Sequence, residues 1–267
     1  MSGLAAAEGD RQVIIGISLK LYLDVGATIT WARAVSSIAR AHPSITAGTT
    51  RMIVLPTLPA IPAAIHEFAE TRIGIGAQDL FWRDTGPYTG AVSGADLRAI
   101  GCGYVEIGHA ERRRVFGEGI EIARLKFGAA LRNGLTPIVC VGESAPHEAD
   151  AAAQDVLGAL DDVVGGVAAD SRWPELIVAY EPEWAIGGED AAPAAHILTV
   201  VGALRARLES DPRFERTAVI YGGSAQAGTF AQLGDSVDGL FLGRFAHDPR
   251  TVKDILDEAE EFAPSSH

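Results

Sequence analysis

Three side chains that could act together on a small molecule, Lys20, His109 and Glu181, each lie at the end of a short apolar run. A glutamate that is partly removed from water can act as a base and take a proton from carbon. A helix that begins after His109 would favour a neutral imidazole, because a helix N-terminus opposes positive charge. A lysine can stabilise negative charge on a substrate oxygen. These residue types therefore suit proton transfer at a carbon next to a carbonyl group.

Glycines and a serine follow the last three apolar runs of the chain. Glycine lets backbone N–H groups approach an anion closely, and several N–H groups directed at one point form an anion site. A short helix after the last run would add the favourable field of its N-terminus. Each glycine alone could mark a tight turn, but together they predict a phosphate-binding site. Its predicted residues are Gly187, Ser224, Gly243 and Arg244.

Eight apolar runs must position these residues. They are rich in Val and Ile and apolar at nearly every position, which is typical of parallel strands buried on both faces. The predicted strands are Val13–Gly16, Met52–Leu55, Ile73–Ala77, Tyr104–Gly108, Pro137–Val141, Leu176–Tyr180, Ala218–Tyr221 and Leu240–Leu242.

Amphipathic segments separate the predicted strands. Between Ile197 and Leu208, for example, apolar residues recur at the spacing of one helix face. Alternating strands and helices predict a parallel sheet, and eight such units predict an α/β fold closed into a single (β/α)8 TIM barrel. An open, doubly wound sheet is the alternative. The other predicted helices cover Ala27–Arg40, Leu58–Glu70, Gly94–Ile100, Ile120–Arg132, Glu148–Val164, Ala227–Leu233 and Thr251–Phe262.

The barrel prediction brings the chemically interesting residues to one place. Active sites of these barrels lie at the carboxyl ends of the strands, and phosphate is commonly bound after the seventh and eighth strands. Lys20, His109 and Glu181 follow the first, fourth and sixth predicted strands. We therefore expect them to converge at the same end of the barrel as the phosphate-binding loops.

Composition limits the possible partners. The net charge of −13 over 267 residues argues against a nucleic-acid partner, since nucleic-acid binders carry a basic patch. No apolar run approaches the roughly 18 residues of a membrane helix, and the N-terminus lacks a secretory signal. We expect a cytoplasmic protein without a membrane partner, formed by one domain over residues 1–267 with flexible ends at about 1–10 and 263–267.

The remaining titratable residues predict neither a metal site nor a cofactor site. Cys102 and Cys140 lack the CxxC spacing, so we expect small buried hydrophobic residues rather than metal ligands. Asp79 and Glu143 are isolated carboxylates, each after a different strand.

The runs AYEPEWAIG, VEIGHAERR, YGGS and LGR resemble those of the triosephosphate isomerase family, and their order and spacing match over roughly residues 12–260. In that family a glutamate base and a neutral histidine electrophile act under a closing loop, which is the family's known pattern. The resemblance implies that Glu181 is the base, His109 the electrophile and Lys20 the stabiliser of an enediolate. It implies that Glu111 supports the site near Lys20.

The resemblance also implies a phosphate cradle, a lid and a dimer. Residues 182–192 correspond to the family's lid, and Arg244 would contribute mainly its backbone N–H to the phosphate. The loop Gly86–Gly90 corresponds to one that enters the neighbouring subunit, with Thr89 reaching that subunit's pocket. A homodimer is therefore expected, with a small phosphorylated sugar as substrate.

The chain departs from the family's pattern beside the reacting carbons. Ser18 stands where the family has a substrate-binding asparagine, Ala110 replaces a serine, and the lid is one residue shorter. The shorter Ser18 opens space, so two substrates fit: a triose phosphate, or a larger tetrulose phosphate such as erythrulose phosphate. A catalytically silent phosphate-binding barrel is the alternative outside the enzymes. A lyase or synthase is disfavoured, because no lysine suited to a Schiff base lies deep in a strand.

Overall fold

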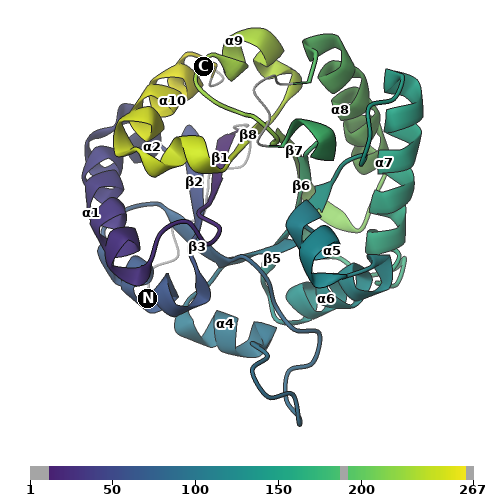
Figure 1. Cartoon of the computed structure of the whole chain (residues 1–267), viewed down its shortest axis with the longest axis horizontal. Helices are drawn as coiled ribbons and strands as arrows, with labels where there is room; N and C mark the ends of the chain where they lie inside the picture. Colours follow the sequence, from purple (N-terminus) through teal and green to yellow (C-terminus); the bar gives the residue numbers. More distant parts are fainter. Residues whose placement is uncertain (1–11, 187–191, 263–267) are drawn as a thin grey trace.

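The computed structural model describes residues 12–186 and 192–262, and their strands close into one barrel surrounded by helices (Figure 1). All neighbouring strands pair in parallel, β8 with β1 included. The predicted (β/α)8 barrel is therefore confirmed, and the open sheet is excluded. The predicted flexible ends lie outside the described residues. The strands are β1 Val13–Ser18, β2 Thr50–Leu55, β3 Gly74–Ala77, β4 Tyr104–Ile107, β5 Thr136–Val141, β6 Trp173–Tyr180, β7 Phe214–Tyr221 and β8 Gly239–Leu242.

The strands are buried on both faces because alternate side chains serve two cores. One set points into the barrel, where Ile14, Ile53, Ile138, Ile177 and Phe241 pack together. The other set points outward and forms the larger core beneath the helices. This alternation explains why the strand sequences are apolar at nearly every position.

The helices cover the outside of the barrel (Figure 1). Most follow the predicted ranges to within a few residues. They are α1 Val25–Ala41, α2 Pro43–Ala47, α3 Ile61–Glu67, α4 Gly94–Ile100, α5 Ala110–Phe116, α6 Ile120–Arg132, α7 Ala149–Val164, α8 Ala194–Glu209, α9 Thr229–Leu233 and α10 Pro249–Phe262, with 3-10 turns η1 Leu58–Ala60, η2 Glu183–Ala185, η3 Gly234–Ser236 and η4 Arg244–His247.

Two local features differ from the sequence prediction. The predicted helix Leu58–Glu70 is divided into η1 and α3, and a proline lies in the first turn of each. Proline is favoured there because the first helical N–H groups need no intrahelical partner. The short α2 was not predicted; it also begins with a proline and ends at Gly48, whose φ of 84° suits a helix C-terminus.

An ion pair crosses the barrel floor, which is the end where the strands begin. Arg51 of β2 donates two hydrogen bonds to Glu175 of β6, at 2.8 and 2.7 Å. Their side chains are 18% and 6% exposed, so the pair is largely removed from water. It joins strands from the two halves of the chain.

The segment between β3 and α4 projects beyond the ring of helices (Figure 1). Within this segment the ring centroid of Phe81 lies 4.0 Å from that of Trp82 and 4.7 Å from that of Tyr88. Arg132 and Asn133 both bind Asp84, so the segment is anchored to α6. No helix in the described ranges is long and apolar enough to cross a membrane.

Candidate active site

Lys20, His109 and Glu181 lie together at the carboxyl ends of β1, β4 and β6. His109 Nε2 lies 3.6 Å from Glu181 Oε2, and Lys20 Nζ donates to Glu111 Oε1 at 2.9 Å. These residues are up to 161 positions apart in the chain, and the barrel brings them to one rim. The fold thus assembles a carboxylate, an imidazole and an ammonium group around one point.

His109 is oriented by the start of α5, where it is the N-cap residue. Its Nδ1 accepts a hydrogen bond from the backbone N–H of Glu111 at 3.0 Å. A nitrogen that accepts cannot carry the proton, so the neutral ring carries its proton on Nε2. That N–H lies on the side of Glu181 and is available as a donor to a substrate oxygen bound next to both residues.

Glu181 is held between glycines of the two neighbouring strands. A Cβ atom at Gly222, just after β7, would lie 2.5 Å from Glu181 Cγ, and one at Gly142, after β5, would lie 1.8 Å from the Glu181 carbonyl oxygen. Only glycine permits so close an approach. The residue is 7% exposed. Within residues 12–186 and 192–262, neither Glu181 Oε2 nor His109 Nε2 has a hydrogen-bond partner.

Lys20 adopts a left-handed backbone conformation with φ of 50°. Its carbonyl oxygen accepts a hydrogen bond from Gln78 Nε2, which also donates to the Leu55 carbonyl, both at 3.0 Å. Burial alone would lower the pKa of Lys20, but the hydrogen bond to Glu111 and the charge of Glu181 outweigh it and raise the pKa. For Glu111, burial opposes ionisation, but the bond from Lys20 prevails and lowers the pKa. Both groups are therefore charged near neutral pH.

Glu106, which we did not select from the sequence, lies in the barrel interior beneath these residues. It is 3% exposed. Its Oε2 accepts from Ser18 Oγ at 2.8 Å, and its Oε1 lies 3.8 Å from both His109 Nε2 and Cys140 Sγ. Burial raises the pKa of Glu106, and the nearby charge of Glu181 raises it further against the opposing effect of His109. The signal in the sequence was a glutamate within an apolar run.

The predicted phosphate loops are partly described. Ser224 is 5% exposed, and its Oγ donates to the Ala185 carbonyl at 2.7 Å. A Cβ atom at Gly243 would lie 3.9 Å from Lys20 Cε, so the β8 loop lies beside the lysine. Arg244 begins η4 with an exposed side chain. Gly187 lies outside the described residues, as does the lid segment 187–191.

Glu143, which the sequence presented as an isolated carboxylate, anchors the first part of the predicted lid. Its Oε1 accepts from Trp184 Nε1 at 2.8 Å and lies 2.9 Å from His196 Nε2. The Tyr180 hydroxyl lies 3.2 Å from both carboxylate oxygens. Burial, then the charge of Glu143, raises the pKa of Tyr180. Next to this cluster Arg113 of α5 pairs with Glu183 of η2.

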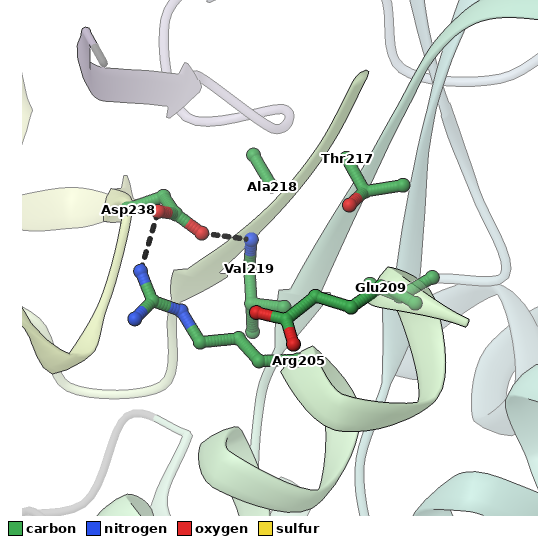
Figure 2. A pocket seen from close by; sticks show the side chains of 7 residues that line it. Arg205, Glu209, Thr217, Ala218, Val219 and Asp238 are labelled. Atoms are coloured by element: carbon green, nitrogen blue, oxygen red, sulfur yellow. Dashed lines mark hydrogen bonds and ion pairs between the residues drawn. The ribbon is translucent and has the colours of Figure 1, made fainter. Parts of the chain in front are cut away.

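A separate hollow of about 290 Å³ lies between α8 and the strands β7 and β8 (Figure 2). Arg205 pairs with Asp238, and Asp238 also accepts from the Val219 backbone N–H at 2.7 Å. Asp238 precedes β8, whereas Gly243 follows it, so this hollow lies toward the floor rather than the catalytic rim. Residues at that end of such barrels commonly serve stability.

Comparison with known proteins agrees with this geometry. The family model described as triosephosphate isomerase matches residues 13–259. The L-erythrulose-1-phosphate isomerase of Pectobacterium atrosepticum is 45% identical over 249 residues, covering 93% of this chain and 96% of the relative. The triosephosphate isomerase of Moorella thermoacetica is 40% identical over 76% and 83% of the two chains. A second L-erythrulose-1-phosphate isomerase, from Mesorhizobium japonicum, is 36% identical over 77% and 82%.

Proposed function

The chain belongs to the triosephosphate isomerase family, and on that premise we propose that it isomerises a phosphorylated four-carbon ketose, with Glu181 as the base. The substrate proposed is L-erythrulose 1-phosphate, which the 45% identical relative is named for. The resemblance of the motifs to this family, found in the sequence, is confirmed. The chain is a sugar-phosphate isomerase, and the four-carbon preference is the part that requires a test.

One observation carries the proposal: two buried polar atoms face each other, and neither has a hydrogen-bond partner among the described residues. They are His109 Nε2 and Glu181 Oε2, 3.6 Å apart. Buried polar atoms in proteins almost always have a hydrogen-bond partner. A substrate that binds beside both groups would supply a carbonyl or hydroxyl oxygen to the imidazole N–H and a C–H group to the carboxylate.

The reaction needs only proton transfers. Glu181 takes the proton from C3 of the ketose, and the C3–H electrons form the double bond of an enediolate across C2 and C3. His109 Nε2–H and the Lys20 ammonium stabilise the negative charge on the two oxygens. The hydroxyl proton of O3 is transferred to O2, and return of the carbon-bound proton from Glu181 to C2 leaves the carbonyl on C3, which gives a tetrulose 4-phosphate of the same composition. The reaction therefore needs no oxidant, reductant or cofactor.

Ser18 supports the four-carbon substrate. A triose phosphate has a hydrogen atom where a tetrulose phosphate carries a hydroxymethyl group, so the larger substrate needs more space beside the reacting carbon. Ser18 is a small, buried side chain at the end of β1, and its hydroxyl is directed at Glu106. Triose phosphate is the second candidate substrate, because the 40% identical relative is named for it.

The phosphate group is assigned to the backbone N–H groups of Gly187, Ser224, Gly243 and Arg244. Two observations support this assignment: the Gly243 loop lies beside Lys20, and the Arg244 side chain is exposed, which leaves its backbone as the contributing part. A homodimer, with Thr89 of the projecting segment reaching the partner's site, is part of the proposal. So is a cytoplasmic location, with which two buried free cysteines are compatible.

The proposal is tested by comparing wild type with Glu181→Gln in D2O, using L-erythrulose 1-phosphate and dihydroxyacetone phosphate in parallel. The wild type is expected to exchange the substrate's carbon-bound proton and to isomerise the tetrulose phosphate. The Gln variant is expected to lose at least 100-fold in kcat, the typical contribution of a general base, without a change in Tm. Normal turnover by the variant would place the base elsewhere, and a wild type inactive on both sugars would favour the silent phosphate-binding barrel.

A further inference from the structure

We propose that Glu106 is a specificity-determining residue, whose carboxyl group binds the terminal hydroxyl group of a four-carbon ketose phosphate. The inference rests on the proposed function, since it assigns the part of the site that contacts the fourth carbon. It uses a residue that the proton-transfer steps do not need.

The surroundings of Glu106 give no structural reason for a carboxyl group. Glu106 pairs in register with Ile138 of β5, and the barrel interior around it is formed by isoleucines, alanines, a leucine, a cysteine and a phenylalanine. Burial of a carboxyl group without full hydrogen bonding is costly. An aliphatic side chain would fill this position without that cost. The polar group is therefore expected to serve a ligand.

Glu106 also has hydrogen-bonding capacity that the protein does not use. Its Oε2 accepts from Ser18 Oγ at 2.8 Å. The polar neighbours of its Oε1 are Cys140 Sγ, a weak donor, and His109 Nε2, both at 3.8 Å. His109 Nε2 also lies 3.6 Å from Glu181 Oε2, so the carboxyl groups of Glu106 and Glu181 both lie next to the same imidazole nitrogen.

The protonation state follows from the neighbours. Burial raises the pKa of Glu106, and the charge of Glu181 adds to that effect, so both favour the neutral carboxyl group. Ser18 already donates to Oε2, so the proton of a neutral Glu106 belongs on Oε1. Glu106 would thus present an O–H donor toward the substrate, while Ser18 fixes the orientation of the carboxyl group.

The topology sets which end of the substrate meets Glu106. In a closed barrel of eight strands in sequential order, β4 lies across from β8. The phosphate is assigned to the loops after β7 and β8, and the reacting carbons lie near Glu181 and His109. A chain that continues past the reacting carbons leads toward β4, where Glu106 lies. A triose phosphate ends before that point, but a tetrulose phosphate carries its hydroxymethyl group there.

The test compares wild type, Glu106→Gln and Glu106→Leu for kcat and KM on L-erythrulose 1-phosphate and on dihydroxyacetone phosphate. If the triose phosphate is not turned over, its competitive inhibition constant replaces kcat/KM. The Leu variant is expected to lose about 10- to 100-fold in kcat/KM for the tetrulose phosphate, the usual effect of one lost hydrogen bond. Its triose phosphate value should stay within about 3-fold. The Gln variant, which can accept from Ser18 and donate to substrate, should recover most of the loss.

Equal losses on both sugars, or no loss on either, would overturn the inference. Failure of the proposed function is distinguishable, because the wild type itself would then not turn over the tetrulose phosphate. Thermal unfolding of each variant checks the fold. If the Leu variant does not fold, Ser18→Ala provides the second measurement: it removes the donor that orients Glu106, and it should lower kcat/KM selectively for the tetrulose phosphate. A loss on the triose phosphate alone would contradict the assignment.

Discussion

Gly222 offers a way to move the carboxylate of Glu181, the proposed base, without changing its chemistry. A Cβ atom at Gly222 would lie 2.5 Å from Glu181 Cγ and 2.7 Å from Oε1. Gly222 is not among the glycines with positive φ, so alanine fits the backbone conformation there. The Gly222→Ala variant therefore perturbs the side chain of Glu181 rather than the strand.

The size of the effect follows from these distances. Carbon atoms in ordinary contact lie about 3.5–4.0 Å apart, so Glu181 Cγ must move by roughly 1 Å. A misplacement of that size can cost about 100-fold in rate, because proton transfer depends on the alignment of the reacting atoms. The Glu181 side chain can rotate away from the methyl group, so we expect a loss of unfolding free energy of no more than about 1–2 kcal/mol.

The assay measures kcat and KM for Gly222→Ala with L-erythrulose 1-phosphate, together with urea unfolding. Gly158→Ala is the matched control, since Gly158 lies on the exposed face of α7 and an added Cβ meets no atom within 4 Å. The control should keep wild-type kcat. Its unfolding free energy should rise by up to about 1 kcal/mol, because alanine is favoured over glycine in a helix by that amount. If Gly222→Ala keeps wild-type kcat, the contact with Gly222 does not position the base, and the reasoning is refuted.

Two further predictions concern stability. Arg51→Met should lower the unfolding free energy by about 3 kcal/mol, because it removes the two hydrogen bonds to the buried Glu175 and leaves Arg216 at 4.0 Å as its remaining ion pair among residues 12–186 and 192–262. Arg51→Met/Glu175→Leu should recover most of the lost unfolding free energy in urea, and an equally unstable double variant would contradict this. Hydrogen bonding by Arg213 lowers the pKa of Asp211 to about 2 from its ordinary value near 4. The stabilisation is complete above pH 4 and is lost as the pH falls toward 2. Asp211→Asn should therefore lower the unfolding free energy by about 2 kcal/mol at pH 7 and leave it unchanged at pH 2. A difference between variant and wild type that stays constant across this pH range would count against the prediction.

The barrel could be predicted from sequence because the strands are short, apolar and regularly spaced. Their lengths were less predictable: β6 and β7 begin earlier than expected, at Trp173 and Phe214, which pair with each other in register. Polar residues such as Glu175 lie within these extensions, so the apolar runs alone gave no sign of them. Pairing between distant segments decides where such strands begin.

The residues of the candidate site were likewise only partly predictable from the sequence. Lys20, His109 and Glu181 follow strands directly, so their convergence follows from the barrel topology. Glu106 was missed because it lies inside a strand, where its role depends on Ser18, 88 residues away. The anchoring role of Glu143 was missed for a similar reason, since Trp184 and His196 meet it only after the chain has folded. Contacts of this kind are properties of the assembled barrel.

The charge pair across the barrel floor has a consequence for exchange of gene segments between relatives. Arg51 belongs to the first four strand–helix units and Glu175 to the last four. A chimera that joined the first half of this chain to a second half with an aliphatic residue in place of Glu175 would inherit a largely buried guanidinium without its carboxylate partner. Recombination between relatives would therefore retain both halves of the pair or neither, and the two positions should change together during evolution.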